Sequence, residues 1–127
     1  MEKEKLVELA YKASEYSYSP YSHFKVGAAL ITEDGSVFTG CNVENSSYGA
    51  TICAERTCAL KAVSEGHRKF KMIAVVSGSN EYTYPCGICR QFLSEFMDGD
   101  GVILVHDKNK GIKEYTLSEM LPEAFHL

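Results

Sequence analysis

Three cysteines in two short motifs have the residue types and the spacing of a zinc site. The motifs are Cys53-Ala54-Glu55-Arg56 and Pro85-Cys86-Gly87-Ile88-Cys89-Arg90. Cys86 and Cys89 are three residues apart, so on a helix they share one face and can bind the same ion. Cys53 must come from another part of the fold. Three protein ligands leave the fourth tetrahedral position to water, which is typical of a catalytic rather than a structural zinc.

Both motifs lie where the sequence predicts the start of a helix. Cysteine binds zinc as a thiolate, and the free N–H groups and the dipole of a helix N-terminus favour that anion. Glu55 follows Cys53 by two residues, so the two side chains point roughly 200° apart around a helix. Both can still reach a metal in front of the helix end. Glu55 is therefore predicted to be an acid/base group rather than a fourth ligand.

Spacing alone leaves two other interpretations of the cysteines open. In the first, Cys58 completes a closed four-thiolate site in a non-catalytic zinc-binding module. Cys58 lies roughly 140° around the helix from Cys53, a direction that favours the core instead. In the second, Cys86 and Cys89 form a redox pair, an interpretation that gives no role to Cys53 and Glu55.

The elements that position these motifs alternate along the chain. Apolar residues at helical spacing predict helices over 3–16, 53–65, 87–97 and 117–121. Strands are predicted over 25–32, 36–42, 72–76, 102–105 and 112–116, and the turn Glu33-Asp34-Gly35 joins the first two into a hairpin. Strands separated by helices imply parallel crossovers in one mixed α/β sheet with helices on its faces.

Composition and charge indicate one globular domain over residues 1–127, long enough to bury a core without disulfides. No apolar run could cross a bilayer, and the charged N-terminus is unlike a signal peptide, so we expect a cytoplasmic protein with no membrane partner. Five cysteines in that compartment are expected to be reduced. The formal net charge is −4 and no block of basic residues is present. A small-molecule partner is therefore favoured over a nucleic acid.

Beyond the zinc motifs, the chain resembles the small homotetrameric zinc-dependent cytidine deaminases along nearly its whole length. Zinc deaminases share a metal ligand two residues before a glutamate, followed later by Pro-Cys-x-x-Cys. The resemblance extends over residues 19–30, 40–45, 53–57, 85–91 and 121–122. It implies a three-layer α/β/α fold around a mixed five-stranded sheet whose last strand is antiparallel. It also implies one Zn²⁺ per chain and a homotetramer with sites shared between chains.

The family's reaction converts cytidine and 2′-deoxycytidine to uridine and 2′-deoxyuridine plus ammonia, in pyrimidine salvage. Zinc makes hydroxide available near neutral pH for attack on C4 of the base. By resemblance, Glu55 moves the water proton to N3 and then protonates the departing amino group. Arg56 is expected to hydrogen-bond the thiolates, because three of them leave the Zn²⁺ site with excess negative charge. Arg90 is equally compatible with this role and with an exposed position on the helix.

The resemblance also implies substrate-binding residues within the chain. Asn42 and Glu44 look like the family's pair that binds the ribose 3′-hydroxyl. Phe24 is similar to the aromatic residue that lies against the pyrimidine. Ala54 is expected to offer its backbone to the amide edge of the base.

Two further aromatic residues resemble those that complete the site of a neighbouring chain. Tyr48 lies in the loop before the first zinc motif, and Phe125 lies in the apolar C-terminal tail. An aromatic residue in a terminal tail is better explained by docking on another surface than by solvation.

Two alternatives keep the fold and change the substrate. The first is a cytosine in a polynucleotide, which the acidic balance and Glu44 disfavour. The short turn over Asp107–Gly111 also predicts an antiparallel last strand, where polynucleotide deaminases more often have a helix. The second is a nucleoside antibiotic, which fits the same features and stays open.

Overall fold

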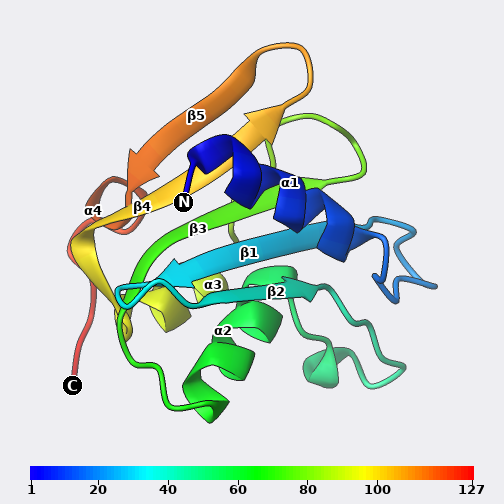
Figure 1. Cartoon of the computed structure of the whole chain (residues 1–127). Helices are drawn as coiled ribbons and strands as arrows, with labels where there is room; N and C mark the ends of the chain where they lie inside the picture. Colours follow the sequence, from blue (N-terminus) through cyan, green and yellow to red (C-terminus); the bar gives the residue numbers. More distant parts are fainter.

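The computed structural model describes all 127 residues. They are arranged around one five-stranded sheet (Figure 1). In the order β2-β1-β3-β4-β5, its strands are Val37–Cys41, Val26–Thr32, Phe70–Ser77, Met97–Asp107 and Gly111–Thr116. β3 and β4 pair in parallel, and the other neighbours pair in antiparallel fashion. The mixed sheet with an antiparallel last strand is confirmed. The predicted parallel crossovers produce only one adjacent parallel pair, because β1 inserts between β2 and β3.

Helices cover both faces of this sheet and form the expected α/β/α layers (Figure 1). α1 (Lys3–Ser14) lies on one face, and α2 (Ala54–Ser64), α3 (Gly87–Ser94) and the short α4 (Leu117–Met120) lie on the other. Successive strand residues alternate between the two cores. Ala28 and Leu30 belong to the core under α2, whereas Ala29 and Ile31 belong to the core under α1. None of the helices combines the length and the apolar character needed to cross a membrane.

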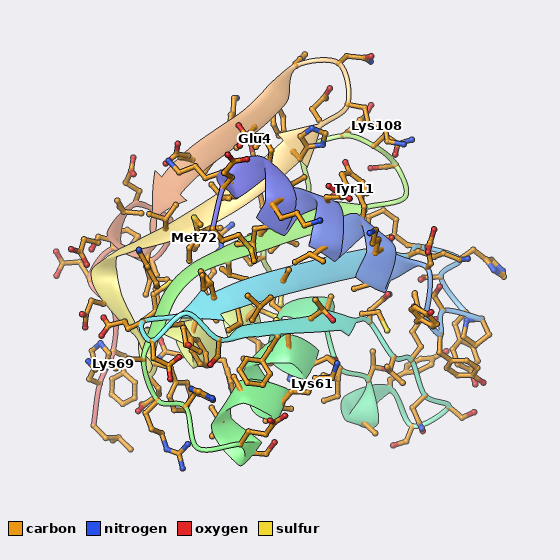
Figure 2. All side chains as sticks on the ribbon, viewed as in Figure 1. Glu4, Tyr11, Lys61, Lys69, Met72 and Lys108 are labelled. Atoms are coloured by element: carbon orange, nitrogen blue, oxygen red, sulfur yellow. The ribbon has the colours of Figure 1, made fainter.

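α1 packs close to the sheet and is tied to it at its C-terminal half. A Cβ atom on Gly27 would lie 2.0 Å from the carbonyl oxygen of Ala10, so β1 needs glycine there. Tyr11 extends from α1 toward the end of β4 (Figure 2). Its hydroxyl lies 2.7 Å from Nδ1 of His106, and the Lys108 ammonium lies 5.5 Å from the centre of its ring.

α2 also packs close to its neighbouring strand, β2, and this contact positions the first zinc motif. A Cβ atom on Gly40 would lie 2.6 Å from the backbone nitrogen of Cys58 and 2.9 Å from the carbonyl oxygen of Ala54. Further along α2, Lys61 donates a hydrogen bond of 2.5 Å to the carbonyl oxygen of Thr39 in β2 (Figure 2). The first turn of α2 is therefore held against the sheet by backbone contact.

Two predicted helices end early. The helix predicted over 87–97 stops at Ser94, and β4 begins at Met97 rather than at residue 102. Met97 pairs with Phe70 of β3 and is buried, so strand pairing overrides the helical spacing of the apolar residues. α1 stops at Ser14 instead of residue 16, because Tyr16 is 82% exposed and has no core to cover.

Candidate metal centre

The structure brings the three predicted zinc ligands together at the starts of α2 and α3. Cys53 and Cys86 are the N-cap residues of these helices, and Cys89 lies in the first turn of α3. The sulfur of Cys86 is 3.9 Å from that of Cys53 and 3.5 Å from that of Cys89, and all three lie within 4.8 Å of one another. Sulfurs bound tetrahedrally to zinc at about 2.3 Å lie about 3.8 Å apart. The donor set therefore fits one zinc ion.

Cys58 is not part of this cluster. Its side chain is fully buried in the core, and its thiol donates to the carbonyl oxygen of Glu55 at 3.2 Å. Burial raises the pKa of the Cys58 thiol, which disfavours the thiolate that a metal needs. The arrangement is one of three sulfurs, as predicted, and not the closed four-thiolate alternative. The redox alternative also does not account for the third sulfur, that of Cys53.

Glu55 lies in the first turn of α2 and is only 4% exposed. Burial, and then the charge of Cys53, raise its pKa to about 7. A carboxyl group with a pKa near neutrality can take up and release a proton in the same cycle. Its position and chemistry are those expected of the proton carrier.

Arg56 lies beside the cluster, as its spacing from Cys53 predicts. Its Nη2 atom donates to the sulfur of Cys53 at 3.6 Å. Hydrogen bonds from Cys89 and from Arg56 lower the pKa of Cys53 to about 5, whereas burial opposes the shift. The hydrogen bond to Cys53 in turn raises the pKa of Arg56. The guanidinium thus supplies positive charge next to a sulfur that is readily deprotonated.

A cavity of about 240 Å³ opens beside the cluster. Its lining brings together four of the expected substrate-binding residues with two of the zinc ligands and the predicted acid/base group: Phe24, Asn42, Glu44, Ala54, Cys53, Cys86 and Glu55. The segments that the resemblance connected therefore meet at one site.

Asn42 is a buried residue in the lining of this cavity, and its side chain fixes the neighbouring backbone. Its Oδ1 accepts from the backbone N–H of Val26 at 3.0 Å, and its Nδ2 donates to the carbonyl oxygen of Phe24 at 2.8 Å. An amide group carries two N–H donors. One of them is left for a ligand.

Glu44 is held by the turn that precedes β1. Its Oε1 accepts from the backbone N–H groups of Tyr21 and Ser22 at 2.9 and 3.1 Å, and the hydroxyl of Ser22 donates to its Oε2. The hydrogen bond from Ser22 is the main reason that the pKa of Glu44 is lowered. Glu44 is therefore an ionised, oriented acceptor at the cavity.

The cavity also contains residues to which the sequence assigned no role. Ser22, Thr83 and Tyr84 line it. Thr83 donates to the hydroxyl of Ser77 at 2.6 Å, and the hydroxyl of Tyr84 lies 3.3 Å from that of Tyr115. Ser22 lies within a segment that carries the resemblance, but the other two lie in a predicted loop with no pattern that marks a site.

Tyr48 and Phe125 do not line the cavity of their own chain. Tyr48, in a 3₁₀ turn over Tyr48–Ala50, is 78% exposed, and Phe125 is 65% exposed. The carbonyl oxygen of Phe125 accepts from Gln91 of α3 at 2.9 Å. The positions of both aromatic rings on the surface leave them available to a neighbouring molecule.

The fold and the three-sulfur centre define a zinc-binding deaminase domain. Residues 1–106 match the family model described as the cytidine and deoxycytidylate deaminase zinc-binding region, and the chain belongs to this family.

Similar proteins extend over nearly all of the chain. It is 48% identical to the cytidine deaminase of Sporosarcina psychrophila over 98% of this chain and 92% of that protein. It is 47% identical to the cytidine deaminase of Halalkalibacterium halodurans, over 98% and 95% of the two chains. The crystal structure of cytidine deaminase from Burkholderia pseudomallei has a TM-score of 0.92 at 43% identity, covering 98% of this chain and 100% of the other.

Proposed function

We propose that this protein deaminates cytidine and 2′-deoxycytidine hydrolytically, giving uridine and 2′-deoxyuridine plus ammonia. One observation carries the proposal. A single cavity lies against a three-sulfur zinc site, and its lining includes a buried carboxyl group with a pKa near neutrality and a polar pair that suits a ribose. The relatives named as cytidine deaminases support the same reaction.

Cys53, Cys86 and Cys89 would hold the zinc, which when bound supplies Lewis-acid activation of water near neutral pH. Glu55 accepts a proton from the attacking water and delivers it to N3 of the base. The carboxylate then takes the remaining proton of the oxygen that has added to C4 and delivers it to the amino nitrogen. The C4–N bond breaks as the C4=O bond forms, and ammonia leaves. The Glu55 pKa of about 7 suits both directions of transfer. Arg56 stays bound to the Cys53 sulfur and balances the charge of the thiolates.

The hydrogen-bonding groups that remain free suit a nucleoside hydroxyl. Asn42 has one N–H to donate, and the ionised Glu44 can only accept. A hydroxyl group can accept from the first and donate to the second, so we assign this pair to the ribose 3′-hydroxyl. A phosphate in this position would face the Glu44 carboxylate. A free nucleoside is therefore favoured over a nucleotide or a polynucleotide.

The base is assigned to Phe24 and Ala54, which line the same cavity. Phe24 lines the cavity and is 42% exposed, so its ring offers an apolar surface to a pyrimidine. Ala54 is the first residue of α2, and its N–H has no partner within the helix. This N–H is proposed to bind the amide edge of the base.

We further propose a homotetramer in which Tyr48 and Phe125 complete the sites of neighbouring chains. Large exposed apolar side chains are concentrated in the segments around the cavity, including Tyr18, Tyr21 and Tyr84. Contact between chains would cover such a surface. A free nucleoside substrate accords with a role in pyrimidine salvage in the cytoplasm.

The proposed activity can be tested with zinc-loaded protein and cytidine. Turnover is followed by the ultraviolet absorbance change and, independently, by ammonia release. Absence of both would contradict the proposal. Single-stranded DNA and a cytosine nucleoside antibiotic are tested in the same assay. Preferential turnover of either compound would favour the corresponding alternative substrate.

A further inference from the structure

Arg90 lies beside the zinc cluster but bonds to backbone carbonyl groups rather than to sulfur. Its Nε donates to the carbonyl oxygen of Pro85 at 2.7 Å, and its Nη1 donates to that of Met120 at 2.9 Å. The two acceptors are far apart in the sequence. One immediately precedes a metal ligand, and the other is the last residue of α4.

The first of these bonds restricts the backbone at Cys86. The Pro85 carbonyl belongs to the peptide group that joins Pro85 to Cys86, so Arg90 fixes the orientation of that peptide plane. The backbone N–H of Arg90 also donates to the carbonyl oxygen of Cys86 at 3.0 Å. Cys86 caps α3 without a side-chain hydrogen bond. The Arg90 side chain thus holds the peptide group that precedes this ligand, whereas the peptide group that follows it is held by the helix backbone.

The second bond connects this ligand to a firmly held part of the fold. α4 starts with a capping box formed by Thr116 and Glu119, and Met120 is buried in the core that α2 and α3 share. The last carbonyl groups of a helix have no partner within it. A guanidinium has several N–H donors in a rigid plane and can bridge two such acceptors, which a lysine ammonium does with less geometric definition.

We propose that Arg90 is a positioning residue for the metal centre. By clamping Pro85 to Met120, it holds Cys86 where its sulfur can share one zinc ion with Cys53 and Cys89. This inference rests on the proposed function for the identity of the metal. It assigns Arg90 no contact with the substrate or with the metal.

The test measures the metal centre in the holoenzyme. Zinc transfer to an excess of a chromophoric chelator is timed for the wild type, Arg90→Gln and Arg90→Lys. Loss of residues that orient metal ligands typically costs about 10- to 100-fold in metal affinity, so we expect Arg90→Gln to release zinc about tenfold faster or more. Arg90→Lys should be intermediate. Substitution of zinc by Co²⁺ should give an altered thiolate-to-cobalt absorption band in Arg90→Gln.

Arg68 provides a matched control at the opposite end of α2. Its Nη1 also donates to two carbonyl oxygens, those of Val63 and His67, at 2.7 and 3.2 Å. Arg68→Gln removes comparable bonds and should release zinc at the wild-type rate. If Arg90→Gln does not fold, Arg90→Lys is compared with Arg68→Lys.

The proposal is overturned if Arg90→Gln releases zinc at the wild-type rate and its Co²⁺ form has the wild-type absorption band. It is also overturned if Arg68→Gln releases zinc as fast as Arg90→Gln does. Both readouts are independent of cytidine turnover. A wild-type protein that binds zinc but does not deaminate cytidine would refute the proposed function and leave this comparison valid.

Discussion

Arg56 lies one helical turn beyond Cys53, and its Nη2 atom is 3.6 Å from the Cys53 sulfur. Both residues are on α2 or at its cap, so the helix itself sets their separation. The guanidinium is the only cation that the structure places in hydrogen-bond contact with the cluster. Three thiolates outweigh the charge of one Zn²⁺, so the function of the site should depend on this arginine.

Arg56→Gln should lower kcat by about 10- to 100-fold, as expected for loss of a group that tunes metal ligands. In the metal-free protein, the same change should raise the pKa of Cys53 from about 5. Less thiolate would then be present at about pH 6, and alkylation by iodoacetamide should slow. Mass spectrometry quantifies modification of Cys53 alone. Arg68→Gln is the control, and equal alkylation rates in all three proteins would contradict this prediction.

Glu55→Gln should lower kcat by about 10²- to 10⁴-fold, because the amide cannot carry a proton. Zinc content should stay at the wild-type level, since Glu55 is not a ligand. Metal analysis and steady-state kinetics on the same preparation check both statements. Loss of zinc from the variant would instead assign Glu55 to the metal.

The same substitution should stabilise the metal-free protein at neutral pH. Folding raises the pKa of Glu55 from 4.5 to about 7. Below pH 4.5 the group is protonated in both states, and between these values only the unfolded state loses its proton, so the wild type loses stability as pH rises. The free energy of unfolding of Glu55→Gln should therefore exceed that of the wild type by an amount that grows over this pH range. This excess should level off at about 3 kcal/mol, the free energy that corresponds to the pKa shift. Urea unfolding at several pH values measures it, and a pH-independent difference would contradict it.

Local spacing was sufficient to predict the ligand pair Cys86 and Cys89, because both are at the start of one helix. The contribution of Cys53 depends on how closely α2 packs on β2. In the sequence, Gly40 alone does not indicate that a helix packs against the strand at this position. The end of α3 was also not predictable from spacing. Phe92 and Phe96 continue the helical pattern, but pairing of Met97 with Phe70 starts a strand. Long-range pairing decided this boundary.

Gly40→Ala should destabilise the protein and disturb the metal centre. The new methyl group would meet the backbone of Cys58 and Ala54 at 2.6 and 2.9 Å, so α2 must shift. Overpacking of this kind typically costs about 1–3 kcal/mol. Thermal unfolding and zinc release should both change. A Cβ atom on Gly49 meets nothing within 4 Å, so Gly49→Ala is the control. A Gly40 variant with normal zinc release would show that the helix can move without affecting the site.

Replacement of each cysteine separates the three-sulfur centre from the four-sulfur alternative. Cys53→Ala, Cys86→Ala and Cys89→Ala should each lose zinc. Cys58→Ala should keep one zinc per chain and retain activity, while losing stability within the usual range of about 0.5–3 kcal/mol. X-ray absorption of the wild type should count three sulfurs. Four sulfurs, or loss of zinc from the Cys58 variant, would contradict the structure.

Phe125 tests whether neighbouring chains share a site. Its ring is 65% exposed and does not line the cavity of its own chain. If it completes a neighbour's site, Phe125→Ala should raise KM for cytidine and should leave zinc content unchanged. The tail would keep its hydrogen bond from Gln91, because that bond uses the backbone of Phe125. Gln91→Ala should therefore weaken substrate binding less than Phe125→Ala does.

Coexpression of Phe125→Ala with Glu55→Gln shows whether the Phe125 ring acts in the site of a neighbouring chain or in that of its own chain. In mixed oligomers, a site with an intact Glu55 from one variant can receive an intact Phe125 from the other only if the ring comes from a neighbouring chain. Random mixing would then restore roughly a quarter of the sites to the wild-type composition, with the wild-type KM. If Phe125 acts within its own chain, no site has both residues and the mixture behaves as the sum of its parts. Cytidine kinetics on purified mixed oligomers, at a subunit ratio checked by mass spectrometry, decide between these outcomes.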